Sequence, residues 1–308
     1  MADTGSSAGS ETGSETGSGT AAGSGGSLPD LAITGSTGQL GGLVARILAD
    51  AGQRQRLLVR DAARAPELPG ADAVVSAYAD PVPAKSSLAG VKTLFMVSAA
   101  EAEDRLQTHF AFVDAAAAAG VQHIVYTSFF GASADCTFTL GRDHYATEER
   151  IRTSGMDYTF LRDNFYLDFL PLMVGDDGVI RGPAGNGVMA AVARGDIARS
   201  AAAVLRDPGM HVDRTYHLTG PEDISLERAA RLLTEGTGRS ISYHHETLAE
   251  AYASRASYGA PPWQVDAWVS TYTAIANGEL AGPTSDVFEL TGREPQGLAD
   301  FLKEAHRL

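Results

Sequence analysis

The sequence predicts an α/β protein built on a doubly wound parallel sheet, with a smaller α/β subdomain toward the C-terminus. Three observations lead to this fold class: apolar runs alternate with helical segments from residue 28 on, a glycine-rich turn joins the first run to the first helix, and the alternation loosens after Asn164. Strands that are apolar throughout are typical of a parallel sheet that helices cover on both faces. Right-handed crossovers wind the helices onto the two faces.

The first half of the chain supplies most of the predicted strands. They are the apolar runs 31–33, 56–59, 73–75, 93–97, 123–127 and 158–161. Leucine, valine and isoleucine at helical spacing predict a helix over 40–50, between the first two strands. An alanine-rich stretch predicts a helix over 102–119 that ends at Gly120, and a further helix is expected around 142–154.

After Asn164 the pattern predicts a looser mixture of elements. They are a helix over 195–206, a strand over 215–218, a helix over 225–234 with Ser225 as its N-cap, a strand over 241–243, and helices over 263–278 and 298–307. An aromatic-rich stretch also lies in this half: Tyr252, Tyr258, Trp263, Trp268 and Tyr272. Packing of the small subdomain and the wall of a substrate pocket both explain these aromatic residues, and the sequence leaves the two open.

Composition excludes several classes of protein. The chain of 308 residues carries 24 Lys and Arg against 38 Asp and Glu, a formal net charge of −14, which argues against direct binding of nucleic acid. A single cysteine excludes an internal disulfide and a multi-cysteine metal site, and we expect no metal. No apolar run reaches the roughly 18–20 residues of a membrane span. We find no basic segment followed by an apolar one at the N-terminus, so a cytoplasmic protein is expected.

The most informative stretch is Ile33-Thr34-Gly35-Ser36-Thr37-Gly38-Gln39-Leu40-Gly41, where the first strand turns into the first helix. Its three glycines are spaced three residues apart. One glycine permits a tight turn, one lets the backbone approach a pyrophosphate, and one lets helix and strand pack closely. The helix N-terminus then offers N–H groups and a positive dipole end to the phosphates. A dinucleotide-binding Rossmann fold is predicted, with a purely structural turn as the alternative.

The end of the second strand bears on the choice of cofactor. An acidic residue at this point usually holds the ribose 2′-hydroxyl of NAD, whereas an arginine receives the 2′-phosphate of NADP. Here Arg60 comes first, Asp61 follows, and Arg64 lies four residues after Arg60. Two guanidinium groups near one phosphate favour NADP, and NADPH over NADH. Asp61 favours NAD, and a solvated surface turn is the third interpretation.

Four motifs together resemble a known family. TGSTGQLG after a strand, LLVRD at the second strand end, HIVYTS at the fifth strand and YTFLRDNFY at the sixth are similar to atypical short-chain dehydrogenase/reductases. The subgroup they resemble most is the NmrA-like proteins, which include type 2 NAD(P)H:quinone oxidoreductases. The resemblance covers about 30–308 and implies an NAD(P)-binding domain over 28–308. We expect its Rossmann core at about 28–165 plus 186–206, its substrate-side subdomain mostly at 207–308, and a disordered Gly/Ser-rich tail at 1–27.

The resemblance also implies roles for individual residues. The pyrophosphate would lie against Gly35, Thr37, Gly38, Gln39 and Leu40, and the 2′-phosphate against Arg60 and Arg64. The inner ribose would lie near Ser98, and the nicotinamide near Thr127, Ser128 and Asn164. Phe165 and Tyr166 would border the nicotinamide and the substrate. Many relatives carry an acidic residue after the third strand, and whether Asp80 takes that role stays open.

The catalytic pair of the wider superfamily is missing. Its typical members use a Tyr with a Lys four residues later, and here His144 and Glu148 occupy those positions. Tyr145 is one residue out of register, which turns it by roughly 100° around the helix. Quinone reduction does not strictly need a strong enzyme acid, so solvent, His144 or Tyr166 could supply the proton. Local packing, orientation of a ligand and acid–base catalysis all stay open for His144 and Glu148, and Ser128 is either a pocket residue or a turn residue.

We therefore expect an NADPH-dependent oxidoreductase that reduces a quinone-like or conjugated small molecule by hydride transfer. His144, Ser128 and Tyr166 are the candidate catalytic residues. The alternative is a non-catalytic, NAD(P)-binding redox sensor that acts through protein partners; an isomerase or a specialised reductase is a third reading. The expected partner is a small-molecule electron acceptor, and a homodimer is left open.

Overall fold

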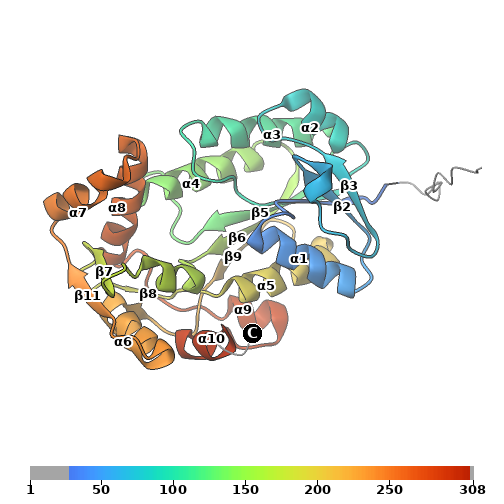
Figure 1. Ribbon diagram of the computed structural model, residues 1–308. Coiled ribbons are helices and arrows are strands. Elements are labelled where there is room, and N and C mark those ends of the chain that lie inside the picture. The colour runs from blue at the N-terminus through green and yellow to red at the C-terminus, as the bar shows by residue number, and fades with distance from the viewer. Residues whose placement is uncertain (1–27, 306–308) are drawn as a thin grey trace, which may run out of the picture.

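Parallel strands form a seven-stranded central sheet in the computed structural model, which describes residues 28–305 (Figure 1). In spatial order they are β3 (Ala71–Val75), β2 (Gln55–Val59), β1 (Leu31–Thr34), β4 (Thr93–Met96), β5 (His123–Phe129), β6 (Asp157–Asp163) and β9 (Arg214–Leu218). Every neighbouring pair runs parallel. The order reverses between β1 and β4, which is where doubly wound sheets bind their ligands.

Helices cover the two faces of this sheet (Figure 1). One face carries α1 (Gln39–Asp50), α5 (Arg194–Arg206) and α9 (Asp286–Thr291), and the other carries α2 (Pro81–Ser87), α3 (Arg105–Ala119) and α4 (Thr139–Arg152). Successive strand residues face opposite sides. Ile33 and Leu57 accordingly pack with the apolar cluster of α1 and α5, whereas Ala32 and Leu58 pack with that of α2 and α3. Burial on both faces explains why these strands are apolar throughout.

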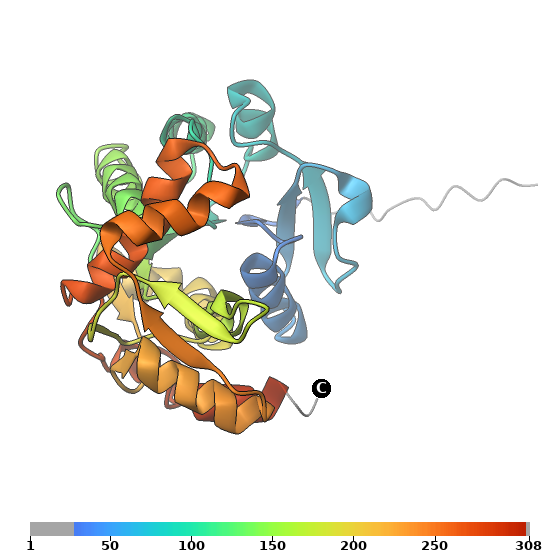
Figure 2. The ribbon, with the colours of Figure 1, turned by 60° about the vertical axis from the view of Figure 1, so that its left-hand side comes forward.

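A further group of elements lies beyond the carboxyl ends of the strands (Figures 1 and 2). These elements enclose a third apolar cluster. The helices of this part are α6 (Leu226–Thr237), α7 (Leu248–Arg255), α8 (Pro262–Ala276) and α10 (Leu298–Ala305). Its strands are β7 (Val179–Gly182) with β11 (Ser242–His245), and β8 (Val188–Met189) with β10 (Ile224–Ser225). Short 3₁₀ segments are η1 (Ala62–Arg64), η2 (Leu167–Met173), η3 (Pro208–His211) and η4 (Ala256–Tyr258).

The predicted fold class is confirmed, and the differences are local. The helix predicted from residue 102 begins only at Arg105, because the residues before it belong to the loop after β4. Gly120 ends that helix as predicted, in a left-handed conformation with φ of 83°. Ser225 caps α6 as predicted, accepting the Arg228 N–H at 3.1 Å. Two elements of the region 207–308 belong with the main sheet: β9 is its last strand, and the helix α9 packs against β9 and α5.

The fold does not test two of the predictions. The predicted tail at 1–27 lies outside the described residues, and the proposed limits of core and subdomain stay a prediction. Among residues 28–305, no helix is both long and apolar enough to cross a membrane.

Candidate functional site

The glycine-rich turn has the geometry that a dinucleotide needs. Gly35 has a φ of 65°, which side chains disfavour, and a Cβ there would lie 3.1 Å from Val97 Cβ. A Cβ on Gly41 would lie 2.4 Å from the Gly35 carbonyl oxygen, so only glycine allows α1 to approach the turn so closely. Gly38 is the N-cap of α1, and no side chain of the described segment caps it. An uncapped helix N-terminus of this kind can bind an anion through its first N–H groups.

At the end of β2, Asp61 is bound within its own turn. Asp61 caps η1, where its carboxylate accepts the Ala63 N–H at 3.0 Å. Arg60 and Arg64 are exposed on either side of it. Asp80, after β3, has a similar local role, because it caps α2 by accepting the Val82 N–H at 3.3 Å. The two guanidinium groups are therefore exposed, whereas both nearby carboxylates cap their own helices.

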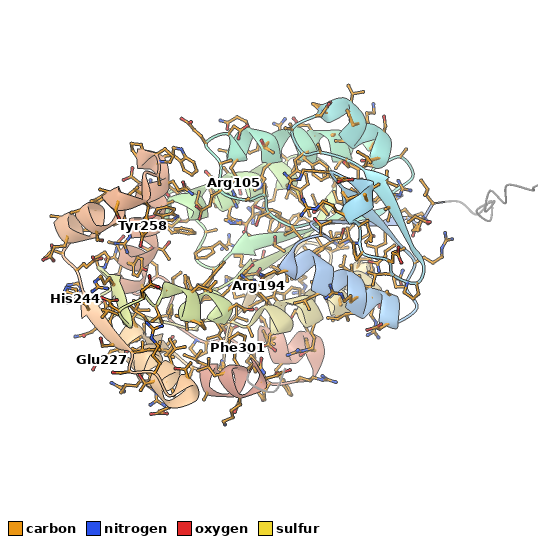
Figure 3. The ribbon with its side chains drawn as sticks, viewed as in Figure 1. Arg105, Arg194, Glu227, His244, Tyr258 and Phe301 are labelled. Atoms are coloured by element: carbon orange, nitrogen blue, oxygen red, sulfur yellow. The ribbon has the colours of Figure 1, made fainter. Side chains whose placement is uncertain are left out.

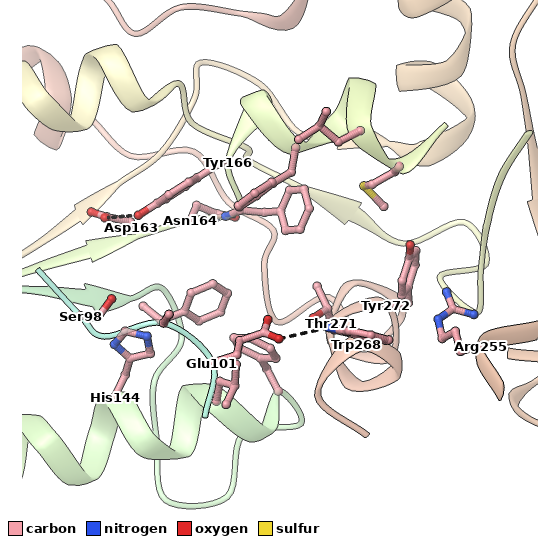
Figure 4. Close-up of a pocket in the computed structure, with 18 of the residues that line it drawn as sticks. Ser98, Glu101, His144, Asp163, Asn164, Tyr166, Arg255, Trp268, Thr271 and Tyr272 are labelled. Carbon is pink, nitrogen blue, oxygen red and sulfur yellow. Dashed lines mark hydrogen bonds between the residues drawn. The ribbon is translucent and has the colours of Figure 1, made fainter. Parts of the chain in front are cut away.

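A cavity of about 840 Å³ opens at the carboxyl ends of β4, β5 and β6 (Figure 4). Aromatic side chains from both halves of the chain line much of its wall: Phe129, Phe138, Phe165, Tyr258, Trp268 and Tyr272. Tyr258, Trp268 and Tyr272 come from the aromatic-rich stretch, so part of that stretch is pocket wall. Glu101, in the loop after β4, accepts hydrogen bonds from Gln264 and from Trp268 on α8. That contact joins the two halves across the cavity.

His144 reaches the cavity from α4, and its ring is fully engaged. Arg105 donates an N–H to Nε2 at 2.9 Å, so Nε2 must be unprotonated, and Nδ1 carries the ring proton toward the Tyr126 hydroxyl at 2.9 Å. Burial, and then the neighbouring Arg105 guanidinium, lower the pKa of His144 well below its usual range. Tyr145 lies instead in a separate hollow beside α3, as its register predicts.

Ser128 and Glu148 belong to a buried charge network. Glu148 is fully buried and accepts two hydrogen bonds from Arg162, at 2.9 and 2.7 Å, and one from Arg152 at 3.1 Å. The Ser128 hydroxyl donates to the same carboxylate at 2.5 Å. His144 and Glu148 therefore bind different partners, and Ser128 lines the cavity with its hydroxyl directed at Glu148.

The other predicted cofactor residues take part in backbone contacts. Thr127 accepts the Ser98 N–H at 2.8 Å, which fixes the loop after β4 against β5. Asn164 is fully buried, donates to the Leu280 carbonyl at 3.0 Å and accepts the Phe165 N–H at 2.7 Å. Ser98 and Asn164 line the cavity, whereas Thr127 lies behind its wall. These side chains shape the cavity by holding its loops.

Tyr166 forms a pair with a residue that sequence reasoning missed. Its hydroxyl donates to Asp163 Oδ2 at 2.9 Å, as Figure 4 shows. Asp163 is 1% exposed, and within the described part of the chain its Oδ1 has no hydrogen-bond partner. Burial raises the pKa of Asp163 well above the usual carboxyl range, and burial together with the Asp163 charge raises that of Tyr166. Both residues line the cavity.

Comparison with known proteins decides the family. A model of the NmrA-like family matches residues 29–257. The chain belongs to the NmrA-like family. An NAD(P)H azoreductase of Xenophilus azovorans is 31% identical, over 89% of this chain and 96% of the relative. Quinone oxidoreductase 2 of Escherichia coli (strain K12) is 32% identical, over 88% and 97%.

A solved structure extends the likeness to three dimensions. The structure of an NADPH-dependent quinone oxidoreductase from Escherichia coli, complexed with NADPH, matches with a TM-score of 0.81 and 30% identity. The match covers 90% of this chain and 99% of that one. This NmrA-like protein is an oxidoreductase, which confirms that prediction. Within residues 28–305 no group of three or more His, Cys, Asp or Glu side chains is placed to hold a metal ion.

Replacing Asp163 with asparagine tests whether the raised pKa of this buried carboxyl lowers the stability of this NmrA-like protein at neutral pH. The raised pKa means that the folded state keeps a proton which the unfolded state releases, so wild-type stability falls as pH rises above the ordinary carboxyl pKa. Asparagine carries no charge, and its side-chain oxygen still accepts from Tyr166. Relative to wild type, we expect Asp163→Asn to gain at least about 1 kcal/mol between pH 5 and pH 8. Urea unfolding at both pH values measures this, with the exposed Asp157→Asn as control; parallel behaviour of wild type and Asp163→Asn would contradict the expectation.

Proposed function

We propose that this protein is an NADPH-dependent reductase of flat, conjugated small molecules such as quinones. The observation that carries the proposal is the aromatic-walled cavity, which opens at the carboxyl ends of β4, β5 and β6. Ser98 in its wall follows Val97, which packs against Gly35 of the glycine-rich turn. Quinone and azo compounds, which give two relatives their names, are flat conjugated electron acceptors. Aromatic walls suit such molecules, because stacking and burial of apolar surface favour them.

The cofactor site of this chain fits a dinucleotide. The uncapped α1 N-terminus and the close approach at Gly41 suit a pyrophosphate, and Thr37, Gln39 and Leu40 would border it. Arg60 and Arg64 would hold the 2′-phosphate, while Asp61 is bound to its own turn. We propose no nucleic-acid partner, because a formal net charge of −14 repels phosphate backbones.

The residues around the cavity support hydride transfer without a Tyr–Lys pair. Bound NADPH supplies the hydride, which reduces the acceptor by two electrons. α4 contains no lysine, and the ring proton of His144 is turned toward Tyr126, away from its Arg105-bound Nε2. We assign His144 and Ser128 to holding the cavity wall. Solvent then protonates the reduced acceptor anion, because the Tyr166 hydroxyl donates its proton to Asp163 and burial raises the pKa of Tyr166. Tyr166 would border the acceptor as part of the cavity wall. Proximity supplies much of the rate enhancement.

NADPH oxidation with a panel of quinones and azo compounds tests the proposal. We expect turnover with several flat acceptors, followed as loss of NADPH absorbance. Tight NADPH binding without turnover on any acceptor would contradict a reductase and favour the redox sensor instead. Failure to bind NADPH would contradict both.

Blocking the cavity tests where the acceptor binds. Thr271 on α8 lines the cavity and is half-buried, so Thr271→Trp places an indole in the space of the acceptor. We expect kcat/KM for a simple benzoquinone to fall at least about tenfold, a loss of roughly 1.4 kcal/mol of transition-state binding, while the Kd of NADPH stays unchanged. Ala276→Trp, at an exposed position on the same helix, is the control. Unchanged kinetics in Thr271→Trp would place the acceptor elsewhere.

A further inference from the structure

Arg194 joins the glycine-rich turn to the acceptor cavity. It is the first residue of α5, and Figure 3 shows it beside the start of α1. Its guanidinium donates to the side-chain oxygen of Gln39, the first residue of α1. The two residues lie 155 positions apart in the sequence. The Arg194 side chain is only 12% exposed. The largely buried Arg194 guanidinium therefore lies beside the uncapped N-terminus of α1, which would receive the cofactor phosphates.

Neighbouring residues hold Arg194 without fully neutralising it. Its guanidinium carbon lies 5.2 Å from the ring centre of Tyr166 and 4.8 Å from that of Phe169, and the two rings are stacked. Asp168 accepts the Arg194 backbone N–H at 3.0 Å, but its other oxygen is 3.3 Å from the guanidinium. One long carboxylate contact and one neutral amide leave a guanidinium that can still gain from an anion.

We propose that Arg194 is a phosphate-binding residue that contacts the pyrophosphate of the bound dinucleotide. This inference rests on the proposed function. The amide oxygen of Gln39 accepts from the guanidinium at the position where a phosphate oxygen would bind. Gln39 is exposed, so its side chain can move aside when a phosphate binds. A guanidinium prefers a charged phosphate oxygen over a neutral amide oxygen. Because Tyr166 and Phe169 also line the cavity, the same contact would fix the cavity wall when cofactor binds.

The pyrophosphate is common to NADPH and NADH, whereas the 2′-phosphate is not. Removing the Arg194 charge should therefore weaken both cofactors by the same factor. A charge-assisted contact of this kind corresponds to roughly a 10- to 150-fold change in Kd. Loss of Arg60 should weaken NADPH alone, so the two arginines are distinguishable by one pair of titrations.

Direct titration of NADPH and NADH into Arg194→Met, Arg194→Lys and wild type tests the inference. Methionine keeps contact with the two rings and removes the charge, and lysine keeps the charge without the planar fork. We expect Kd to rise about equally for both cofactors in Arg194→Met, and less in Arg194→Lys. Arg206→Met, which removes an exposed charge from the same helix, should leave both Kd values unchanged.

Thermal unfolding separates binding from packing. A lowered melting temperature with unchanged Kd values in Arg194→Met would mean that Arg194 only packs against the rings, and would overturn the inference. If Arg194→Met does not fold, Arg194→Gln removes the charge with a polar side chain, and unchanged Kd values for both cofactors in that variant would overturn the inference as well. Failure of wild type to bind either cofactor would instead overturn the proposed function.

Discussion

Replacing Glu148 with alanine is expected to lower the free energy of unfolding by about 3–5 kcal/mol. The Glu148 carboxylate is fully buried and accepts hydrogen bonds from Arg162, Arg152 and Ser128. Alanine would leave the guanidinium of Arg162, itself 16% exposed, without its carboxylate partner. An uncompensated charge in a region of low dielectric costs far more than the lost contact alone.

Urea unfolding measures this effect, and the chain offers a close control. Glu149 follows directly on α4, is 48% exposed and bonds to Arg152 at 2.5 Å. Because exposed ion pairs contribute about 0–1 kcal/mol, Glu149→Ala should change stability little. Equal losses in Glu148→Ala and Glu149→Ala would mean that the buried network does not hold β5, β6 and α4 together. The Ser128 side of the cavity should also lose order in Glu148→Ala.

Signals within one element were readable from the sequence. The apolar strands, the three spaced glycines and the Ser225 cap each depend on residues a few positions apart. The helix α2 was missed although it carries such signals, with Asp80 as its N-cap and Pro81 at its first position. Its seven residues offer too short an apolar pattern for a periodicity argument.

Features of the site that depend on distant residues could not be predicted. Asp163 sits at the end of β6, and its burial depends on β9, whose Leu218 pairs with it in the sheet. The lowered pKa of His144 depends first on its burial and then on Arg105, 39 residues earlier. The proposed role of Arg194 depends on its contact with Gln39, which lies 155 positions earlier in the sequence. A sequence gives the type of each side chain, but the charge it holds and the ligand it meets depend on the tertiary neighbours that exclude water.

The choice between cofactors is expected to depend on Arg60. We expect wild type to bind NADPH more tightly than NADH, and Arg60→Ala to weaken NADPH by roughly 10- to 150-fold, which is the 1.5–3 kcal/mol of a charge-assisted contact. The affinity for NADH should stay nearly constant, because NADH has no 2′-phosphate for Arg60 to meet. Arg64 is the last residue of η1, and Arg60 directly precedes its N-cap Asp61, so the double variant should lose more affinity for NADPH than the single one.

Calorimetric or fluorescence titration of both cofactors decides this, with Arg46→Ala, an exposed position on α1, as the control for net charge. Salt sharpens the test, since screening weakens an exposed charge pair and the NADPH preference should therefore shrink at high ionic strength. Equal affinity of wild type for the two cofactors would contradict the assignment of Arg60. In that case the Asp61 carboxylate would have to release the Ala63 N–H and bind the ribose instead. Asp61→Ala, and not Arg60→Ala, would then be the variant that weakens cofactor binding.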